Sequence, residues 1–144
     1  MAIERNAHAT WDGDLRGGSG RFDTGSGAIT GEEVTFASRF EESGGKTSPE
    51  ELIAAAHATC FSMALAGGLA KAGHPPTRIE TDAVATLDQA EGGFRLTSMK
   101  LSVRGEVDGL DADGFQQAAQ AAKVGCPVSK ALAAVDISLD AALD

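Results

Sequence analysis

The stretch of residues 48–72 constrains the fold of this chain more than any other part of the sequence. It opens with Ser-Pro-Glu-Glu at residues 48–51, a capping-box pattern in which the serine and the second glutamate each accept a hydrogen bond from a backbone N–H. Gly73, Pro75 and Pro76 end the predicted helix. Apolar or small side chains occupy nearly all of its circumference. Such a helix belongs in the centre of a structure, and we expect it to be enclosed on most sides.

Polar residues within this helix argue against a membrane span. His57, Thr59 and Ser62 interrupt the apolar run, which is rich in alanine rather than leucine. The chain opens with Met-Ala-Ile-Glu-Arg, which lacks the apolar core of a signal peptide. We therefore expect a cytoplasmic protein whose two cysteines are kept in a reducing compartment.

Composition limits both the partners and the size of the core. Asp and Glu number 21 against 12 Lys and Arg, and the net charge of −9 disfavours binding to nucleic acid or to an anionic membrane. The length suits a single domain over residues 1–144, but only 33 residues carry large apolar side chains, whereas 26 are alanine. Because a second copy of the chain would bury more apolar surface, we expect a homo-oligomer.

The remaining sequence predicts an α+β protein. Short β-type pieces precede the long helix, and alternating apolar residues such as Met99, Leu101 and Val103 indicate strands after it. Two shorter helices follow, the first capped by Asp111 and the second opened by Pro127. The predicted strands cover residues 7–11, 21–24, 34–40, 78–87, 94–107 and 135–139, and the shorter helices cover residues 112–123 and 127–133.

The two cysteines have different settings. They lie 66 residues apart, which is neither a CxxC redox motif nor a zinc-ligand spacing. Cys60 lies in the middle of the long helix, where a cysteine commonly serves as a small apolar side chain. Cys126 precedes Pro127, so it is either an incidental cap or a thiol whose ionised form is favoured by the N–H groups of a helix start. His57 shares the helix face of Cys60, and we interpret it as a core histidine rather than a metal ligand.

Arg39 and Glu50 allow two interpretations. They are either a surface charge at the end of a strand and an acid in the first turn of the long helix, or a pair in which Glu50 orients an Arg39 that stabilises a thiolate. Glu50 precedes Cys60 by ten residues, about 15 Å along a straight helix. A second chain or a bent path would therefore have to bring the pair to Cys60, which favours a dimer.

Four segments resemble one protein family and together cover almost the whole chain. Residues 48–65 (SPEELIAAAHATCFSMAL) and 122–129 (AKVGCPVS) closely resemble the two cysteine segments of the OsmC/Ohr peroxidases. Residues 8–14 (HATWDGD) and 38–41 (SRFE) extend the resemblance. The Arg-Phe pair before the helix and the Ala-Ala-His ahead of the first cysteine are similar to the OsmC branch rather than the Ohr branch.

This resemblance implies an intertwined homodimer with the cysteine helices in the centre, antiparallel sheets wrapped around them, and active sites at the subunit interface. It implies a peroxidase that reduces organic hydroperoxides and, less or variably, hydrogen peroxide. Carried onto this sequence, Cys60 is the peroxidatic cysteine, Cys126 is the resolving cysteine, and Arg39 with Glu50 is the activating pair, with Arg21 as the alternative to Arg39. The implied chemistry needs no metal, flavin or haem.

In the implied reaction, the Cys60 thiolate attacks one peroxide oxygen, expels an alcohol and becomes a sulfenic acid. Cys126 then condenses with it to a disulfide, which an external dithiol of the lipoyl or thioredoxin type reduces. Phe40, Phe61 and Met63 are candidates for lining an apolar substrate pocket.

Two other functions remain compatible with the residues. The first is a non-catalytic α+β dimer that binds an apolar ligand and uses both cysteines for packing. The second, a thiol–disulfide isomerase, is less well supported because such enzymes normally carry two cysteines in one short motif. Oxidation of both thiols by an alkyl hydroperoxide would distinguish a peroxidase from the apolar-ligand binder.

Overall fold

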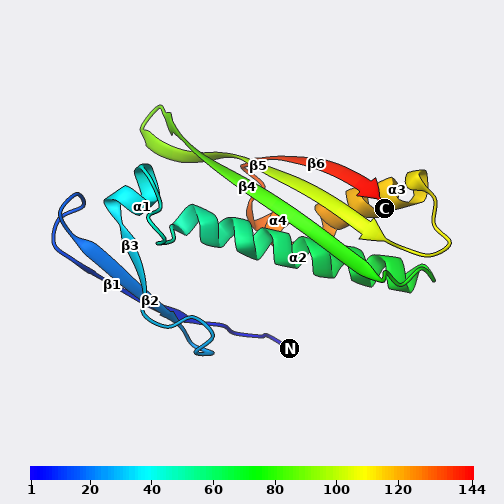
Figure 1. Ribbon diagram of the computed structural model, residues 1–144, viewed down its shortest axis with the longest axis horizontal. Coiled ribbons are helices and arrows are strands. Elements are labelled where there is room, and N and C mark those ends of the chain that lie inside the picture. Colours follow the sequence, from blue (N-terminus) through cyan, green and yellow to red (C-terminus); the bar gives the residue numbers. More distant parts are fainter. The chain divides into compact units, whose positions relative to one another are not determined.

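The computed structural model describes all 144 residues, which form two compact units, residues 1–52 (unit 1) and residues 53–144 (unit 2). Each unit contains a three-stranded sheet together with helical segments, so the predicted α+β class is confirmed (Figure 1). The elements are β1 (Ala7–Asp12), β2 (Ser19–Thr24), β3 (Glu32–Thr35), α1 (Phe36–Phe40), α2 (Pro49–Lys71), β4 (Arg78–Ala90), β5 (Gly93–Glu106), α3 (Ala112–Gly125), α4 (Pro127–Ala131) and β6 (Asp136–Leu143).

The sheet of unit 1 is antiparallel, in the order β1-β2-β3. The predicted strands over residues 7–11 and 21–24 are confirmed with small changes at their ends. Gly20 pairs with Trp11 across the sheet, and a Cβ at Gly20 would lie 2.7 Å from the indole ring. Glycine at this position therefore gives the tryptophan room to lie against the neighbouring strand.

The prediction of one strand over residues 34–40 is wrong, because β3 ends at Thr35 and α1 follows directly. The helix begins there because Thr35 and Ser38 form a capping box, with each side chain accepting the other residue's backbone N–H. Phe36 and Phe40, four residues apart, then stack on one side of the turn with ring centroids 4.9 Å apart. The same four-residue spacing also fits the alternation of a strand, and for this reason the sequence pattern predicts a strand here.

The long helix α2 begins and ends close to where the sequence predicts. Ser48 caps it by accepting the backbone N–H of Glu51 at 3.1 Å. The Glu51 carboxylate accepts from the hydroxyl of Thr47 at 2.8 Å, so the predicted reciprocal bond to the serine N–H is replaced by a bond to the preceding side chain. At the other end Gly73 has a φ of +89°, and the N–H of His74 donates to the carbonyl of Leu69, as in a Schellman motif.

The sheet of unit 2 combines an antiparallel and a parallel pair. β4 and β5 form a long antiparallel hairpin, whereas β6 pairs with β5 in the parallel direction. The expectation of antiparallel sheets is therefore correct except for β6. A parallel return needs a crossover, and α3 and α4 supply it between β5 and β6.

The core of unit 2 lies between this sheet, one face of α2, and α3 (Figure 1). The buried face of α2 repeats every four residues, and the buried positions of β5 alternate as predicted. Gly105 allows close packing, because a Cβ there would lie 2.5 Å from the ring of Phe115. The largest fully buried side chains are Phe61, Phe115, Leu65, Leu69, Met99, Leu101, His57 and Cys126.

The opposite face of α2 is not covered by the other elements of unit 2. Met63 on that face is 70% exposed, and Thr59 and Gly67 are also exposed. Unit 2 thus encloses one side of the helix, whereas the sequence predicts enclosure on most sides. By length and composition alone α2 could also cross a membrane, a property that the core helices of soluble proteins share.

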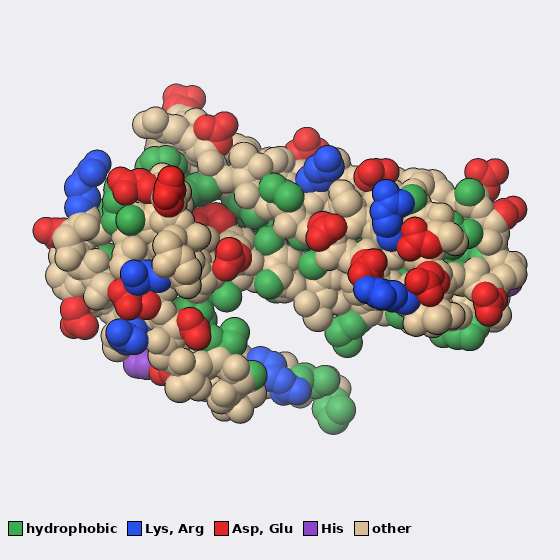
Figure 2. Space-filling view, in the orientation of Figure 1, with side chains coloured by type: hydrophobic (Ala, Val, Ile, Leu, Met, Phe, Trp, Pro, Cys, Tyr) green, Lys and Arg blue, Asp and Glu red, His purple; other side chains and the backbone are tan.

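Charged side chains are distributed over the molecular surface. In the face shown in Figure 2, acidic groups are spread over the visible elements and Lys and Arg lie among them. Four of the five ion pairs join arginine to a carboxylate, and the fifth joins Lys46 to Glu33. This visible face therefore carries no gathered basic patch of the kind that binds nucleic acid.

Candidate active site

The two cysteines, 66 residues apart in sequence, meet in unit 2. Their sulfur atoms lie 3.0 Å apart, and both thiols are free. Cys60 comes from the middle of α2 and is partly exposed, whereas Cys126 is fully buried between α3 and α4. Since a disulfide bond is about 2.05 Å long, a movement of about 1 Å would join the two sulfurs.

The position of Cys126 follows from the local sequence. Its backbone N–H donates to the carbonyl of Ala122 at the end of α3, and Pro127 opens α4 directly after it. Proline can start a helix because the missing N–H is one that a first turn leaves unpaired. The predicted placement of Cys126 at a helix start is therefore confirmed, although its side chain makes no capping hydrogen bond there.

The surroundings of the two thiols favour ionisation of Cys126 before Cys60. Burial raises the pKa of Cys60, the hydrogen bond with Cys126 raises it further, and the backbone of Val128 acts in the opposite direction. Burial acts to raise the pKa of Cys126 as well, but the neighbouring thiol of Cys60 and the polar groups of Ser129 and Val128 outweigh it and lower the pKa. None of the groups that shift the pKa of Cys60 is a cation.

A buried histidine and a buried serine lie next to this pair. His57 is fully buried, and its Nε2 lies 2.7 Å from the Oγ of Ser129. The Nδ1 atom of His57 has no hydrogen-bond partner. Burial lowers the pKa of His57, so the ring is neutral at pH 7. The sequence predicts only a core histidine here.

The sequence analysis did not identify Ser129 as a site residue, although its short distance from Cys126 along the chain offered a clue. It lies three residues after Cys126, within the first turn of α4, and its polar groups act to lower the pKa of that thiol. A serine near the start of a helix usually hydrogen-bonds only to the backbone at that end of the helix. Only the fold reveals that His57, 72 residues away, reaches the Ser129 hydroxyl.

Arg39 and Glu50 form a bidentate ion pair in unit 1. The Nη2 of Arg39 donates to Oε1 of Glu50 at 2.8 Å, and its Nε lies 3.2 and 3.3 Å from the two carboxylate oxygens. The side chain of Glu50 is 12% exposed and that of Arg39 is 35% exposed. Arg39 belongs to α1 rather than to a strand, and its guanidinium lies over the ring of Phe40. The structure thus holds this guanidinium in a fixed orientation.

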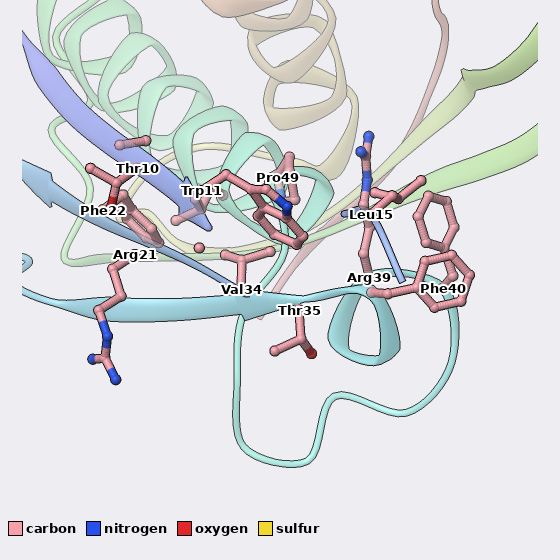
Figure 3. Close-up of a pocket in the computed structure, with 14 residues that line it drawn as sticks. Thr10, Trp11, Leu15, Arg21, Phe22, Val34, Thr35, Arg39, Phe40 and Pro49 are labelled. Carbon is pink, nitrogen blue, oxygen red and sulfur yellow. The ribbon is translucent and has the colours of Figure 1, made fainter. Parts of the chain in front are cut away.

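Arg21 has different partners. It donates to the carbonyl of Gly31 at 3.0 Å, and its Nη2 lies 3.5 Å from Glu33. Its side chain is 65% exposed, and its guanidinium points away from Trp11 in Figure 3. Both arginines border the same cavity of unit 1, but Arg39 is the more firmly held of the two.

That cavity has a volume of about 420 Å³ and is mainly apolar. Of the three predicted pocket residues, Phe40 lines it. Phe61 and Met63 do not line this cavity, because Phe61 is fully buried in the core of unit 2 and Met63 lies on the exposed face of α2, and their role at a substrate pocket stays a prediction. The labelled lining residues in Figure 3 are Thr10, Trp11, Leu15, Arg21, Phe22, Val34, Thr35, Arg39, Phe40 and Pro49.

Comparison with known proteins places this arrangement in a family. Residues 42–140 match the family model described as "OsmC-like protein". The chain belongs to the OsmC family. It is 46% identical over 140 residues to the peroxiredoxin OsmC of Escherichia coli K12, a match that covers 97% of this chain and 96% of that protein. It is 34% identical over 101 residues to the organic hydroperoxide resistance protein OhrA of Bacillus subtilis, with 67% of each chain covered.

Solved structures show the same fold. The organic hydroperoxide resistance protein OhrB of Bacillus subtilis matches with a TM-score of 0.76 and 26% identity, over 95% of this chain and 98% of that one. An organic hydroperoxide resistance protein from Elizabethkingia anophelis matches over the whole of both chains with a TM-score of 0.79 and 23% identity. The OsmC/Ohr-like fold expected from the resemblance is therefore confirmed.

Proposed function

We propose that this protein is a cysteine-based peroxidase that reduces organic hydroperoxides to alcohols. Membership of the OsmC family and 46% identity to a peroxiredoxin over nearly the full length make it a peroxidase. The observation that carries the finer proposal is the 3.0 Å separation of two free thiols that no short motif would bring together. Together these findings favour an enzyme over a binder of apolar ligands.

Cys60 is the thiol that attacks the peroxide in this proposal. It is the partly exposed member of the pair, whereas a peroxide could not reach the fully buried Cys126 without movement of the chain. The Cys60 thiolate forms an S–O bond to one peroxide oxygen while the O–O bond breaks, and the electron pair leaves with the alkoxide, which takes a proton to become the alcohol. Cys60 is left as a sulfenic acid.

A cation near Cys60 would favour its thiolate at neutral pH. Burial and the Cys126 hydrogen bond both raise the pKa of Cys60, and no cation in unit 2 counteracts them. Arg39, oriented by Glu50, can supply the positive charge and can also stabilise the developing alkoxide. We assign this activating role to Arg39.

Cys126 resolves the sulfenic acid. Its thiolate attacks the Cys60 sulfur, the S–O bond breaks, and hydroxide leaves and takes a proton to become water. The adjacent sulfurs and the lowered pKa of Cys126 both support this step. An external dithiol of the lipoyl or thioredoxin type then reduces the disulfide.

A homodimer within the cytoplasm completes the proposal. The exposed apolar face of α2, with Met63 near its centre, gives a second copy a surface to cover. A reducing compartment suits an enzyme that must regain two free thiols after each turnover. The whole chain, residues 1–144, would then act as one OsmC-like domain whose units are completed by a partner.

The apolar cavity of unit 1 is the observation that favours the second candidate, a binder of apolar ligands. Thiol titration separates the two functions. We expect one equivalent of an alkyl hydroperoxide to remove both thiols of each chain, and dithiothreitol to restore them. Unchanged thiols would favour the ligand binder, and loss that dithiothreitol does not reverse would contradict the disulfide step.

A further inference from the structure

Two side-chain contacts join α2 to the start of α4, and the reaction described so far uses only one of them. The sulfur atoms of Cys60 and Cys126 lie 3.0 Å apart. The other contact places Nε2 of His57 at 2.7 Å from Oγ of Ser129. His57 precedes Cys60 by three residues, and Ser129 follows Cys126 by three residues. The two contacts are therefore neighbours, between segments that run in opposite directions.

The hydrogen bond between His57 and Ser129 is enclosed in the core of unit 2. His57 is fully buried, and Ser129 is only 7% exposed. The Nδ1 atom of His57 has no partner, so Nε2 makes the only hydrogen bond of the ring. If Ser129 moved away, both ring nitrogens would be buried without a partner, which is costly. The bond therefore opposes separation of α4 from α2.

The position of the Cys126 sulfur depends on how α4 lies against α2. Cys126 is the single residue between α3, which ends at Gly125, and α4, which begins at Pro127. A helix of five residues is not stable by itself, so contacts with the rest of unit 2 must hold α4 in place. The Ser129 hydroxyl makes such a contact three residues after Cys126.

We propose that His57 and Ser129 are positioning residues that hold Cys126 beside Cys60, so that the disulfide forms before Cys60 is oxidised a second time. This inference rests on the proposed function for its place in the reaction. Joining the sulfurs requires a movement of about 1 Å, because a disulfide bond is about 2.05 Å long. Since hydrogen bonds to oxygen tolerate distances of about 2.7 to 3.2 Å, the neighbouring bond allows this small movement and opposes a larger separation.

The contact would decide between two reactions of the Cys60 sulfenic acid. In the first, the Cys126 thiolate forms a bond to the Cys60 sulfur, the S–O bond breaks, and hydroxide leaves and takes a proton to become water. In the second, another hydroperoxide transfers an oxygen to the same sulfur and is reduced to an alcohol, and the sulfur becomes a sulfinic acid that a dithiol does not reduce. Holding Cys126 close favours the first reaction.

The equilibrium between the dithiol and the disulfide tests the inference without a hydroperoxide. Each protein is equilibrated with reduced and oxidised glutathione, quenched with acid and alkylated with N-ethylmaleimide, and both forms are measured by mass spectrometry. In Ser129→Ala we expect the equilibrium constant for forming the disulfide to fall by about threefold or more, as the loss of one hydrogen bond would produce. His57→Leu should lower it similarly. The double variant should fall no further, because the two side chains act through one bond.

Two more variants distinguish positioning from a general loss of stability. His57→Gln keeps an amide that can bond to Ser129, and it should stay closer to wild type than His57→Leu. Ser62→Ala is the matched control, because the hydroxyl of Ser62 lies 2.7 Å from that of Thr81 and joins the same helix α2 to β4. It should lower the free energy of unfolding in urea and leave the disulfide equilibrium unchanged.

Several results would overturn the inference. These are an equilibrium constant in Ser129→Ala equal to that of wild type, an equal fall in Ser62→Ala, or single losses that multiply in the double variant. The ratio between Ser129→Ala and wild type should also be the same at pH 7 and pH 8.5, because position does not depend on ionisation of the thiols. A ratio that changes with pH would show that the variant acts through ionisation and would contradict positioning.

A second measurement follows the reaction with excess alkyl hydroperoxide. Ser129→Ala should consume the first equivalent at the wild-type rate and afterwards carry more sulfinic acid on Cys60, observed by intact mass. A slower first phase with an unchanged amount of sulfinic acid would contradict the positioning role. If hydroperoxides do not oxidise the wild type, the proposed function fails, while the glutathione equilibrium still tests the contact. If that equilibrium is unaltered although hydroperoxides oxidise Cys60, the inference alone fails.

Discussion

At the scale of single residues, the chemistry depends on the different surroundings of the two thiols, which shift their pKa values in opposite directions. The polar groups of Cys60, Ser129 and Val128 lower the pKa of Cys126, although that sulfur is fully buried. Cys60 is more exposed, and burial together with the hydrogen bond to Cys126 raises its pKa. A positive charge brought to Cys60 would favour its thiolate, and we assign that charge to Arg39.

The activating role of Arg39 can be measured directly. In a Cys126→Ser background, Arg39→Ala should raise the pKa of Cys60, observed as the pH dependence of its alkylation. The reaction with an alkyl hydroperoxide at pH 7 should slow by about tenfold or more, equivalent to about 1.4 kcal/mol of barrier. Glu50→Ala should have a smaller effect, because it only orients the guanidinium.

The matched control is Arg78→Ala, which removes an exposed ion pair with Glu80 and should leave Cys60 unchanged. An unaltered alkylation pKa in Arg39→Ala, combined with a shift in Arg21→Ala, would transfer the role to Arg21.

The burial of His57 predicts that the free energy of unfolding depends on pH. Burial lowers the pKa of His57 in the folded state, so below about pH 6.5 the unfolded chain binds a proton that the folded chain does not. The free energy of unfolding should therefore fall with decreasing pH below that value, by up to about 1.4 kcal/mol per pH unit from this group. Urea unfolding at pH 7.5 and 5.5, at fixed protein concentration, measures it. His57→Gln should show a smaller loss, and an identical loss in both proteins would contradict the prediction.

At the scale of elements, α1 shows where local capping overrides an alternating pattern. Residues 34–40 alternate well enough to predict a strand, but the Thr35 and Ser38 side chains pair with backbone N–H groups and start a helix instead. This short helix carries Arg39, and the Ser38 hydroxyl also donates to the carbonyl of Thr47, just before α2. The capping serine thus links the segment of Arg39 to the helix of Glu50.

Removing the hydrogen bond between Ser38 and Thr47 should lower the free energy of unfolding. Ser38 is 9% exposed, and Ser38→Ala should lower the free energy of unfolding by about 1–2 kcal/mol, since a helix cap and a largely buried hydrogen bond are lost together. Urea unfolding measures the loss, and the control Ser43→Ala, exposed in the connection before α2, should be within about 0.5 kcal/mol of wild type. A Ser38→Ala protein as stable as this control would contradict the account.

At the scale of the whole molecule, the sequence predicts most helices and strands but does not predict how the strands pair. The capped central helix, the long hairpin and the α+β class were predictable because periodicity and end signals are local. The parallel pairing of β6 with β5 was not, since alternation identifies a strand but not the direction of its partner. The bond between His57 and Ser129 joins residues 72 positions apart, and no local pattern could predict it.

The exposed apolar face of α2 predicts that the protein forms a homodimer. Sedimentation equilibrium at low micromolar concentration should give about twice the chain mass of 14.7 kDa. Met63→Glu, which places a charge on the uncovered face, should shift the protein toward the monomer, because burying a charge at an apolar interface is costly. Val84→Glu, at a strand position that is 58% exposed, is the control and should remain dimeric. A wild-type monomer under these conditions would contradict the dimer.

The central claim is that Cys60 takes the oxygen of a hydroperoxide and Cys126 removes it, and single-turnover oxidation without reductant tests this most directly. Wild type, Cys60→Ser and Cys126→Ser are each mixed with an alkyl hydroperoxide in a stopped-flow instrument, and the products are trapped with dimedone. We predict that wild type consumes about one equivalent per chain and forms a disulfide, that Cys126→Ser first consumes about one equivalent and forms a dimedone adduct on Cys60, and that Cys60→Ser consumes none. Consumption by Cys60→Ser at the wild-type rate would contradict the account.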